Sequence, residues 1–155
     1  MSLFSHALIT FLIAMAPVLE LRFAIPYGVE VGELSHLSAA IIAVAGNLLP
    51  VPFVIIFARR VFAWMKKKSA RLGRFAEMLE RKAEKNRTAL NRGIVLGLML
   101  FVAIPLPGTG AWTGSLLAAV FDIRLRTALP AITAGVLIAG ALVTGITFGF
   151  GSLLG

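Results

Sequence analysis

Long apolar stretches make up most of the chain, and two of them are interrupted at their centres by residues that do not suit a helix. The first interruption contains Pro17, Glu20, Arg22 and Pro26, and the second covers residues 104–110, Ile-Pro-Leu-Pro-Gly-Thr-Gly. Proline removes a backbone donor and glycine permits positive φ, so we predict that neither stretch continues as a straight helix. Irregular backbone within apolar sequence is tolerated where protein or a wet cavity satisfies its polar groups, so the two breaks together predict one internal site.

The first apolar segment allows two arrangements. In one, residues 3–16 form a half-helix that enters the membrane from outside, the chain turns at 17–22, and residues 23–32 return to the same side. In the other, residues 3–19 cross completely and Glu20 and Arg22 lie at the interface. We favour the re-entrant form, because 17 residues are the lower limit for a span and because this break then matches the second one.

The clearest membrane span is formed by residues 37–58, whose 22 residues make about 33 Å of helix. Asn47 lies near its centre, where an uncharged amide needs protein or water as a partner. It serves either helix packing or substrate contact. Residues 93–104 and 111–121 are each too short to cross, so we predict a second re-entrant hairpin at 93–121, followed by a second span at 127–150.

These elements form two units of opposite orientation. The first hairpin, residues 1–36, and its span begin outside the membrane, whereas the second hairpin and its span begin in the cytoplasm. We therefore predict one all-α integral membrane domain, residues 1–155, with an inverted-topology repeat and a basic amphipathic linker helix within 59–92. Half-depth hairpins leave backbone facing lipid unless another copy covers them, so we expect a homodimer.

Composition and charge agree with a membrane protein. Hydrophobic residues make up 59% of the chain, charged residues only 14%, and the mean hydropathy is +0.93. Residues 59–92 hold 12 of the 15 basic residues, which predicts a cytoplasmic linker lying on anionic lipids, both termini outside, and location in the inner (plasma) membrane. Confinement of the charge to one short linker argues against nucleic acid as a partner.

Candidate chemistry for an enzyme is missing from the sequence. The chain has no cysteine, which excludes disulfides, thiol catalysis and cysteine-ligated metals. Neither histidine stands in a recognisable spacing with a serine or a carboxylate, and no nucleophile, base and orienting group occur together. We therefore expect no enzymatic activity, no cofactor and no metal.

Two motifs resemble those of a known family. Residues 20–26, Glu-Leu-Arg-Phe-Ala-Ile-Pro, and residues 105–114, Pro-Leu-Pro-Gly-Thr-Gly-Ala-Trp-Thr-Gly, are similar to the signature motifs of the putative small multi-drug export protein family of prokaryotic membrane proteins. The general layout also resembles the DedA or VTT-domain superfamily, whose members have paired re-entrant hairpins and include proposed lipid-phosphate flippases and scramblases. Members of that superfamily typically use acidic and basic residues in their hairpins. Glu20 and Arg22 match this pattern, whereas the second hairpin here carries no charge.

The residues at the breaks suggest a transport site. We expect Arg22 to bind an anionic head group such as a lipid phosphate, aided by N–H groups at the start of the 111–121 helix, and Glu20 to carry a coupling proton. The alternative for these two residues is a purely structural Glu20–Arg22 ion pair that holds the hairpin in place. The predicted substrate-binding residues are Arg22, Glu20, Thr109, Gly110, Trp112, Thr113 and Asn47, and the predicted hairpin breaks are Pro17, Pro26, Pro105, Pro107 and Gly108.

The sequence thus predicts a transporter or flippase, ion-coupled, that moves an amphiphilic anion between the two hairpins. An exporter of lipophilic cations would instead depend on Glu20. A non-transporting membrane scaffold is a third possibility, although it leaves both helix breaks unexplained.

Overall fold

The computed structural model describes residues 2–68, 70, 73, 74, 78, 87–106 and 108–154, and within these residues it is helical, without strands. The predicted all-α class is confirmed. The elements, in chain order, are α1 (Leu3–Met15), α2 (Glu20–Pro26), the π-helix η1 (Tyr27–Val31), α3 (His36–Leu48), α4 (Val51–Lys68), α6 (Arg87–Ala103), α7 (Ala111–Val120) and α8 (Leu125–Leu154).

Two long apolar helical segments form the frame of the molecule. One extends over His36–Trp64 and the other over Leu125–Gly149, and both are long and apolar enough to cross a membrane. The first is longer than the predicted span at 37–58, since α4 continues to Lys68. Basic residues are good helix formers whose long side chains can extend past an apolar segment, which explains why the helix does not end where the charges begin. The amphipathic helix predicted within the linker falls mainly outside the described residues.

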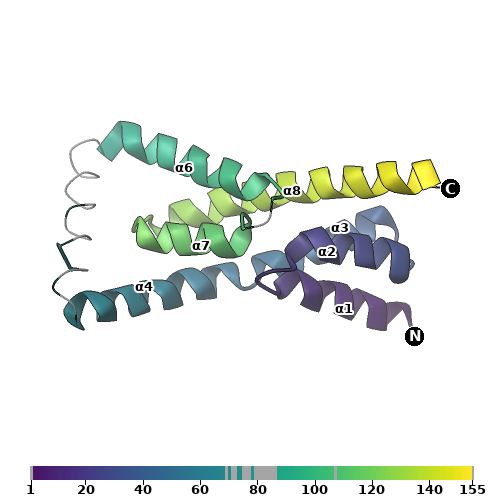
Figure 1. Cartoon of the computed structure of the whole chain (residues 1–155), viewed down its shortest axis with the longest axis horizontal. Helices are drawn as coiled ribbons and strands as arrows, with labels where there is room; N and C mark the ends of the chain where they lie inside the picture. Colours follow the sequence, from purple (N-terminus) through teal and green to yellow (C-terminus); the bar gives the residue numbers. More distant parts are fainter. Residues whose placement is uncertain are drawn as a thin grey trace.

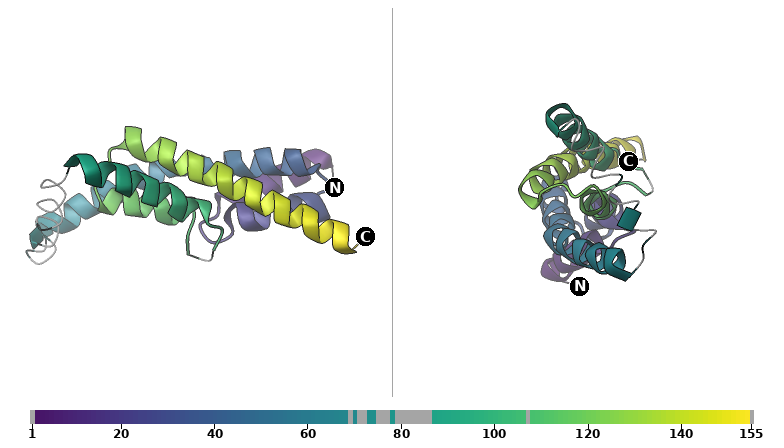
Figure 2. Two further views of the ribbon diagram at one scale, coloured as in Figure 1. Left: turned by 90° about the horizontal axis from the view of Figure 1, so that it is seen from above. Right: turned by 90° about the vertical axis from the view of Figure 1, so that its left-hand side faces the viewer.

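The shorter helices form two hairpins that point toward each other (Figure 1). The turn between α1 and α2 and the turn between α6 and α7 both lie near the middle of the long helices. Each hairpin contacts both long segments: α1 packs on α3, and α2 on α3 and α8, while α6 packs on α8, and α7 on α4 and α8. Both termini lie at one end of the long axis, and the end of α4 lies at the other (Figure 2).

Local sequence explains most of the helix ends. Ser2 and Ser35 cap α1 and α3, and each side chain accepts a backbone N–H three residues later. At Ala16, just before Pro17, the chain turns to an extended conformation, as expected for a residue that precedes proline. The break expected at Pro26 is wrong, however. Helical structure continues through this proline, and the segment from Tyr27 widens into the π-helix η1, which accommodates the missing N–H without interrupting the chain.

Close helix packing holds each hairpin on its long partner. A Cβ atom at Gly46 of α3 would lie 2.5 Å from the Phe11 carbonyl oxygen of α1, and one at Gly135 of α8 would lie 2.7 Å from the Met99 carbonyl oxygen of α6. Small residues permit this approach of two helix backbones. Gly135 therefore packs within the chain. The two contacts fix the depth at which the hairpin turns face each other.

Candidate functional site

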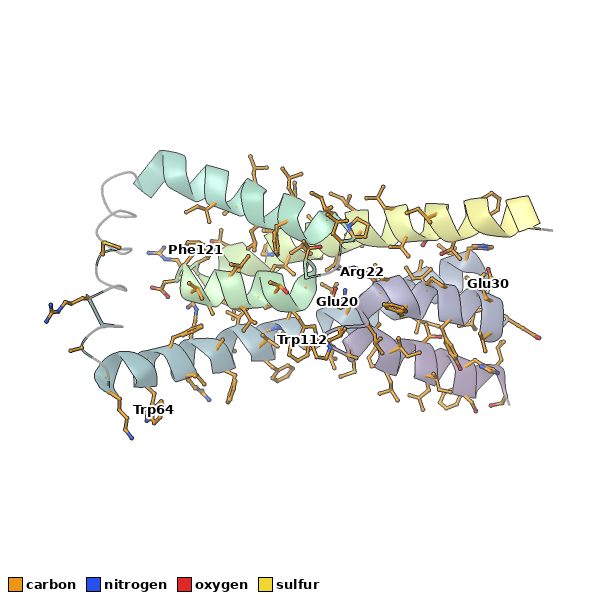
Figure 3. All side chains as sticks on the ribbon, viewed as in Figure 1. Glu20, Arg22, Glu30, Trp64, Trp112 and Phe121 are labelled. Atoms are coloured by element: carbon orange, nitrogen blue, oxygen red, sulfur yellow. The ribbon has the colours of Figure 1, made fainter. Side chains whose placement is uncertain are left out.

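The two hairpin turns are joined by polar contacts across a long sequence separation. A guanidinium nitrogen of Arg22, Nη2, donates to the backbone oxygen of Thr109 and lies 3.2 Å from its hydroxyl, although the two residues are 87 positions apart. The same nitrogen is 3.7 Å from a carboxylate oxygen of Glu20. Figure 3 shows Glu20, Arg22 and Trp112 close together at the centre of the molecule, with Glu30 and Trp64 toward its opposite ends.

Glu20 caps the N-terminus of α7, a helix of the other hairpin. Its Oε1 accepts the backbone N–H of Trp112 at 3.2 Å, and the N–H of Ala111 also faces the carboxylate. Only 3% of Glu20 is exposed. The N-terminus of a helix carries unpaired N–H groups and partial positive charge, so a carboxylate is well matched to this position. Together with Arg22, these groups compensate the buried negative charge.

The backbone of both turns is shaped around this carboxylate. Glu20 has φ of +49°, a left-handed conformation that costs a non-glycine residue about 1–2 kcal/mol. Gly110, the N-cap residue of α7, has φ of +124° and provides no side-chain cap of its own. A Cβ atom at Gly110 would lie 2.7 Å from the carboxyl carbon of Glu20. Glycine at this position therefore leaves the space that the Glu20 carboxylate occupies.

Trp112 makes the reciprocal contact. Its indole Nε1–H donates to the backbone oxygen of Met15, at the last turn of α1, at 3.0 Å. Carbonyl groups at a helix C-terminus lack intrahelical partners, and this donor satisfies one of them. Each hairpin thus caps a helix end of the other. Sequence analysis missed both caps. For the cap on α7, the signal in the sequence is a glycine directly before the helix. Glycine has no side chain that could accept the first N–H groups of the helix, so the acceptor must come from another part of the chain.

A small cavity lies where the hairpins meet the long helices. Its polar lining comes from Glu20, Arg22 and Asn47, and the remaining lining residues are Leu21, Val102, Pro105, Gly110, Ala111, Val136 and Ala139. The volume of about 10 Å³ leaves room for about one water molecule. Asn47 is 1% exposed, and its side-chain oxygen has no hydrogen-bond partner among the residues that the structure describes. The lining of the cavity therefore includes a buried polar atom that the described residues leave unsatisfied.

The sequence as a whole identifies the family. Residues 20–142 match the family model described as "Putative small multi-drug export protein". The chain belongs to this family. The match confirms the resemblance based on the two motifs, and it begins at Glu20 and contains every residue that lines the cavity. No curated protein and no solved structure matches the chain. Membership in this family, together with the two apolar helices, supports a membrane location.

Most of the predicted site residues of this small multi-drug export family member lie at the meeting point of the hairpins. The predicted residues that line the cavity are Glu20, Arg22, Asn47, Pro105 and Gly110. Thr109 and Trp112 are hydrogen-bonded to lining residues, Thr109 to Arg22 and Trp112 to Glu20. Thr113 is not part of the cavity lining that the structure describes. Pro17 and Gly108 are exposed in the turns, and Pro107 lies outside the described residues.

Proposed function

We propose that this protein is a membrane transporter whose substrate binds between two re-entrant hairpins, at the Glu20–Arg22 pair. The observation that carries the proposal is this charged pair, with Glu20 buried and Arg22 half-buried, in a cavity where two hairpin turns meet. An ionised side chain at membrane depth costs at least about 2.5–3.5 kcal/mol on insertion scales, and such residues mark substrate and ion pathways. The family description, which names export, supports the same class of function.

The lengths of the short helices support re-entrant hairpins. A span needs about 20 residues, whereas α1 has 13 and α7 has 10. α6 has 17 residues, but its apolar part is only Gly93–Ala103. In the orientation that we propose, the basic end of α4 lies in the cytoplasm and both termini lie outside.

An inverted repeat is supported by two correspondences between the halves. The first helix of each hairpin packs on the long helix that follows it, and the second contacts the long segments of both halves. The turns that lead into α3 and α8 also match, since Glu33 has φ of +53° and Asp122 has φ of +49°, each followed by an aliphatic residue. Transporters built from inverted repeats bind their substrates at the repeat interface. The resemblance of the layout to the DedA or VTT-domain superfamily points the same way.

An amphiphilic anion such as a lipid phosphate is the substrate class that the site favours. Arg22 offers a guanidinium and α7 offers N–H groups at its positive end. The Thr109 hydroxyl positions Arg22, since it accepts from the guanidinium while it donates to backbone oxygens of its own turn. When Glu20 is neutral, these groups leave the site with net positive charge. The apolar faces of the hairpins would contact the hydrocarbon part of such a substrate.

Lipophilic cations are the second candidate, which the family description favours. Glu20 is the one carboxylate among the described residues that line the cavity, and a cationic drug would bind it in place of a proton. The two candidates predict opposite pH dependence. A cation that competes with the proton binds more tightly as the pH rises, whereas an anion that requires neutral Glu20 binds more tightly as the pH falls.

Thermal stabilisation of the purified protein tests the proposal. The ligands are geranylgeranyl phosphate, phosphatidylglycerol and tetraphenylphosphonium, and the variants are Arg22→Gln, Arg22→Lys and the exposed control Arg60→Gln. A ligand at 100 times its Kd stabilises the folded state by about 2.7 kcal/mol, which this assay detects. We expect stabilisation by geranylgeranyl phosphate in the wild type and in Arg60→Gln, a weaker effect in Arg22→Lys, and none in Arg22→Gln.

Two results would change the conclusion. Stabilisation by tetraphenylphosphonium that survives Arg22→Gln would support the cationic substrate in place of the anion. If no ligand of the panel stabilises the wild type while all variants fold, the transporter proposal loses its support and the scaffold alternative is favoured.

A further inference from the structure

We infer that the Glu20 carboxylate occupies the position of the substrate's phosphate group, so that the two exclude each other at the N-terminus of α7. This inference rests on the proposed function and specifies which group occupies the site when the substrate is absent. It also narrows the substrate class to a phosphate monoester, or free phosphate, that retains an acidic hydroxyl.

The donors around Glu20 are those that a phosphate would use. The N–H groups of Trp112 and Ala111 face the carboxylate, and Arg22 lies 3.7 Å from it. Backbone N–H groups at a helix N-terminus combined with an arginine are a common phosphate-binding arrangement. The missing side chain at Gly110 leaves the concave space in front of these donors. Because Glu20 fills that space, no second anion can reach the same donors while the carboxylate stays.

Asn47 supplies the second observation. Asn47 belongs to α3, is 1% exposed and lines the same cavity, and its side-chain oxygen has no partner in the described part of the chain. An ionised carboxylate accepts hydrogen bonds and has none to donate, so Glu20 cannot satisfy this oxygen. A phosphate monoester in its singly charged form can, because its hydroxyl donates while its other oxygens accept from α7 and Arg22. A substrate of this kind would complete every hydrogen bond that Glu20 leaves open.

Protonation of Glu20 would allow a phosphate to replace the carboxylate at the N-terminus of α7. Arg22 is the charged group that faces it from its own hairpin, and α7 contributes N–H dipoles. The other helices that line the cavity contribute the neutral residues Asn47 of α3, Val102 of α6, and Val136 and Ala139 of α8. Arginine stays protonated at working pH, so Glu20 alone titrates among these described lining residues. A neutral Glu20 would release the donors, and one proton would therefore bind together with each anion.

Fluorescence of Trp112 reports binding directly. The chain has two tryptophans, so Trp64→Phe leaves Trp112 as the single probe, at the helix end where the ligand would bind. The titrants are inorganic phosphate and geranylgeranyl phosphate at pH 6 and pH 8, in that background. The test variants are Glu20→Gln and Asn47→Leu, and the matched control is Glu30→Gln, an exposed carboxylate far from the site.

We expect the parent protein to bind phosphate more tightly at pH 6 than at pH 8, by up to about tenfold per pH unit for the proton linked to Glu20, in addition to the pH dependence of the ligand itself. Glu20→Gln should bind at least tenfold more tightly than the parent at pH 8 and keep only the pH dependence of the ligand itself. Glu30→Gln should behave like the parent. Asn47→Leu should weaken binding by about tenfold, the loss of one buried hydrogen bond, without changing the pH dependence. If inorganic phosphate displaces geranylgeranyl phosphate, the site recognises the phosphate group alone. If geranylgeranyl phosphate binds and inorganic phosphate does not, the phosphate group that the site recognises is that of a lipid.

Other results overturn the inference in distinguishable ways. If the parent binds phosphate but Glu20→Gln binds it no better, with the pH dependence unchanged, Glu20 is not a competitor and the inference fails while the proposed function stands. If Glu20→Gln does not fold, weaker binding of the parent at pH 6 than at pH 8 overturns the inference by itself. If neither the parent nor Glu20→Gln binds either phosphate at either pH, the anionic substrate of the proposed function fails as well.

Discussion

Replacement of Gly110 by alanine tests the central contact of the site with a single methyl group. The added Cβ would lie 2.7 Å from the carboxyl carbon of Glu20, closer than real Cβ contacts come. It would also place a side chain on backbone with φ of +124° and ψ of −170°. We expect the Glu20 carboxylate to leave the N-terminus of α7 in this variant, and the free energy of unfolding to fall.

The magnitude has two parts. Backbone of this kind, which is essentially restricted to glycine, costs alanine about 1–3 kcal/mol. Loss of the hydrogen bond from Trp112 to a charged acceptor costs about 1.5–3 kcal/mol more. Gly110→Ala should therefore destabilise the protein by about 2.5–6 kcal/mol.

Gly108 is the matched control for the strain alone. It also has positive φ, +85°, but a Cβ atom there would meet nothing within 4 Å. Gly108→Ala should cost about 1–2 kcal/mol. Unfolding in mixed detergent–SDS micelles, followed by circular dichroism, gives both values. In a Glu20→Ala background, where the carboxylate is absent, Gly110→Ala should cost about 1.5–3 kcal/mol less than in the wild type.

The reasoning would be refuted if Gly110→Ala and Gly108→Ala destabilised the protein equally, or if Glu20→Ala left the cost of Gly110→Ala unchanged. Either result would mean that the Glu20 carboxylate is not held against Gly110.

Two further predictions concern the packing around the site. Gly135→Ala should destabilise the protein by about 1–3 kcal/mol, because its Cβ would meet the Met99 carbonyl oxygen at 2.7 Å, whereas Gly145→Ala, on the same helix with nothing within 4 Å, should be neutral or slightly stabilising in the same unfolding assay. Trp112→Phe removes the indole donor to Met15 and should cost about 1 kcal/mol in unfolding free energy. An unchanged midpoint for Trp112→Phe would contradict a stabilising role for that hydrogen bond.

The sequence by itself determined the class of the protein and the places where its helices break. Composition and two long apolar segments specify a helical membrane protein, since few charges and long apolar runs fit no other common class. The breaks after α1 and after α6 follow from Pro17 and Pro105, because the restriction that proline places on the preceding residue acts locally. Glu20 and Arg22 could be singled out because charge within apolar sequence is expensive wherever it lies.

The tertiary structure decided which groups satisfy one another. The sequence left open whether the N–H groups at the start of α7 are unpaired in the absence of a substrate. In the structure the N–H of Trp112 is paired with Glu20, 92 residues away along the chain. The depth of the hairpins, set by close backbone packing at Gly46 and Gly135, brings these groups together, and no local pattern encodes that depth. Pro26 shows the same limit, because a π-helical segment can absorb a proline when the surrounding packing requires a continuous helix. Local chemistry fixed where the chain bends, and long-range packing fixed what each bend touches.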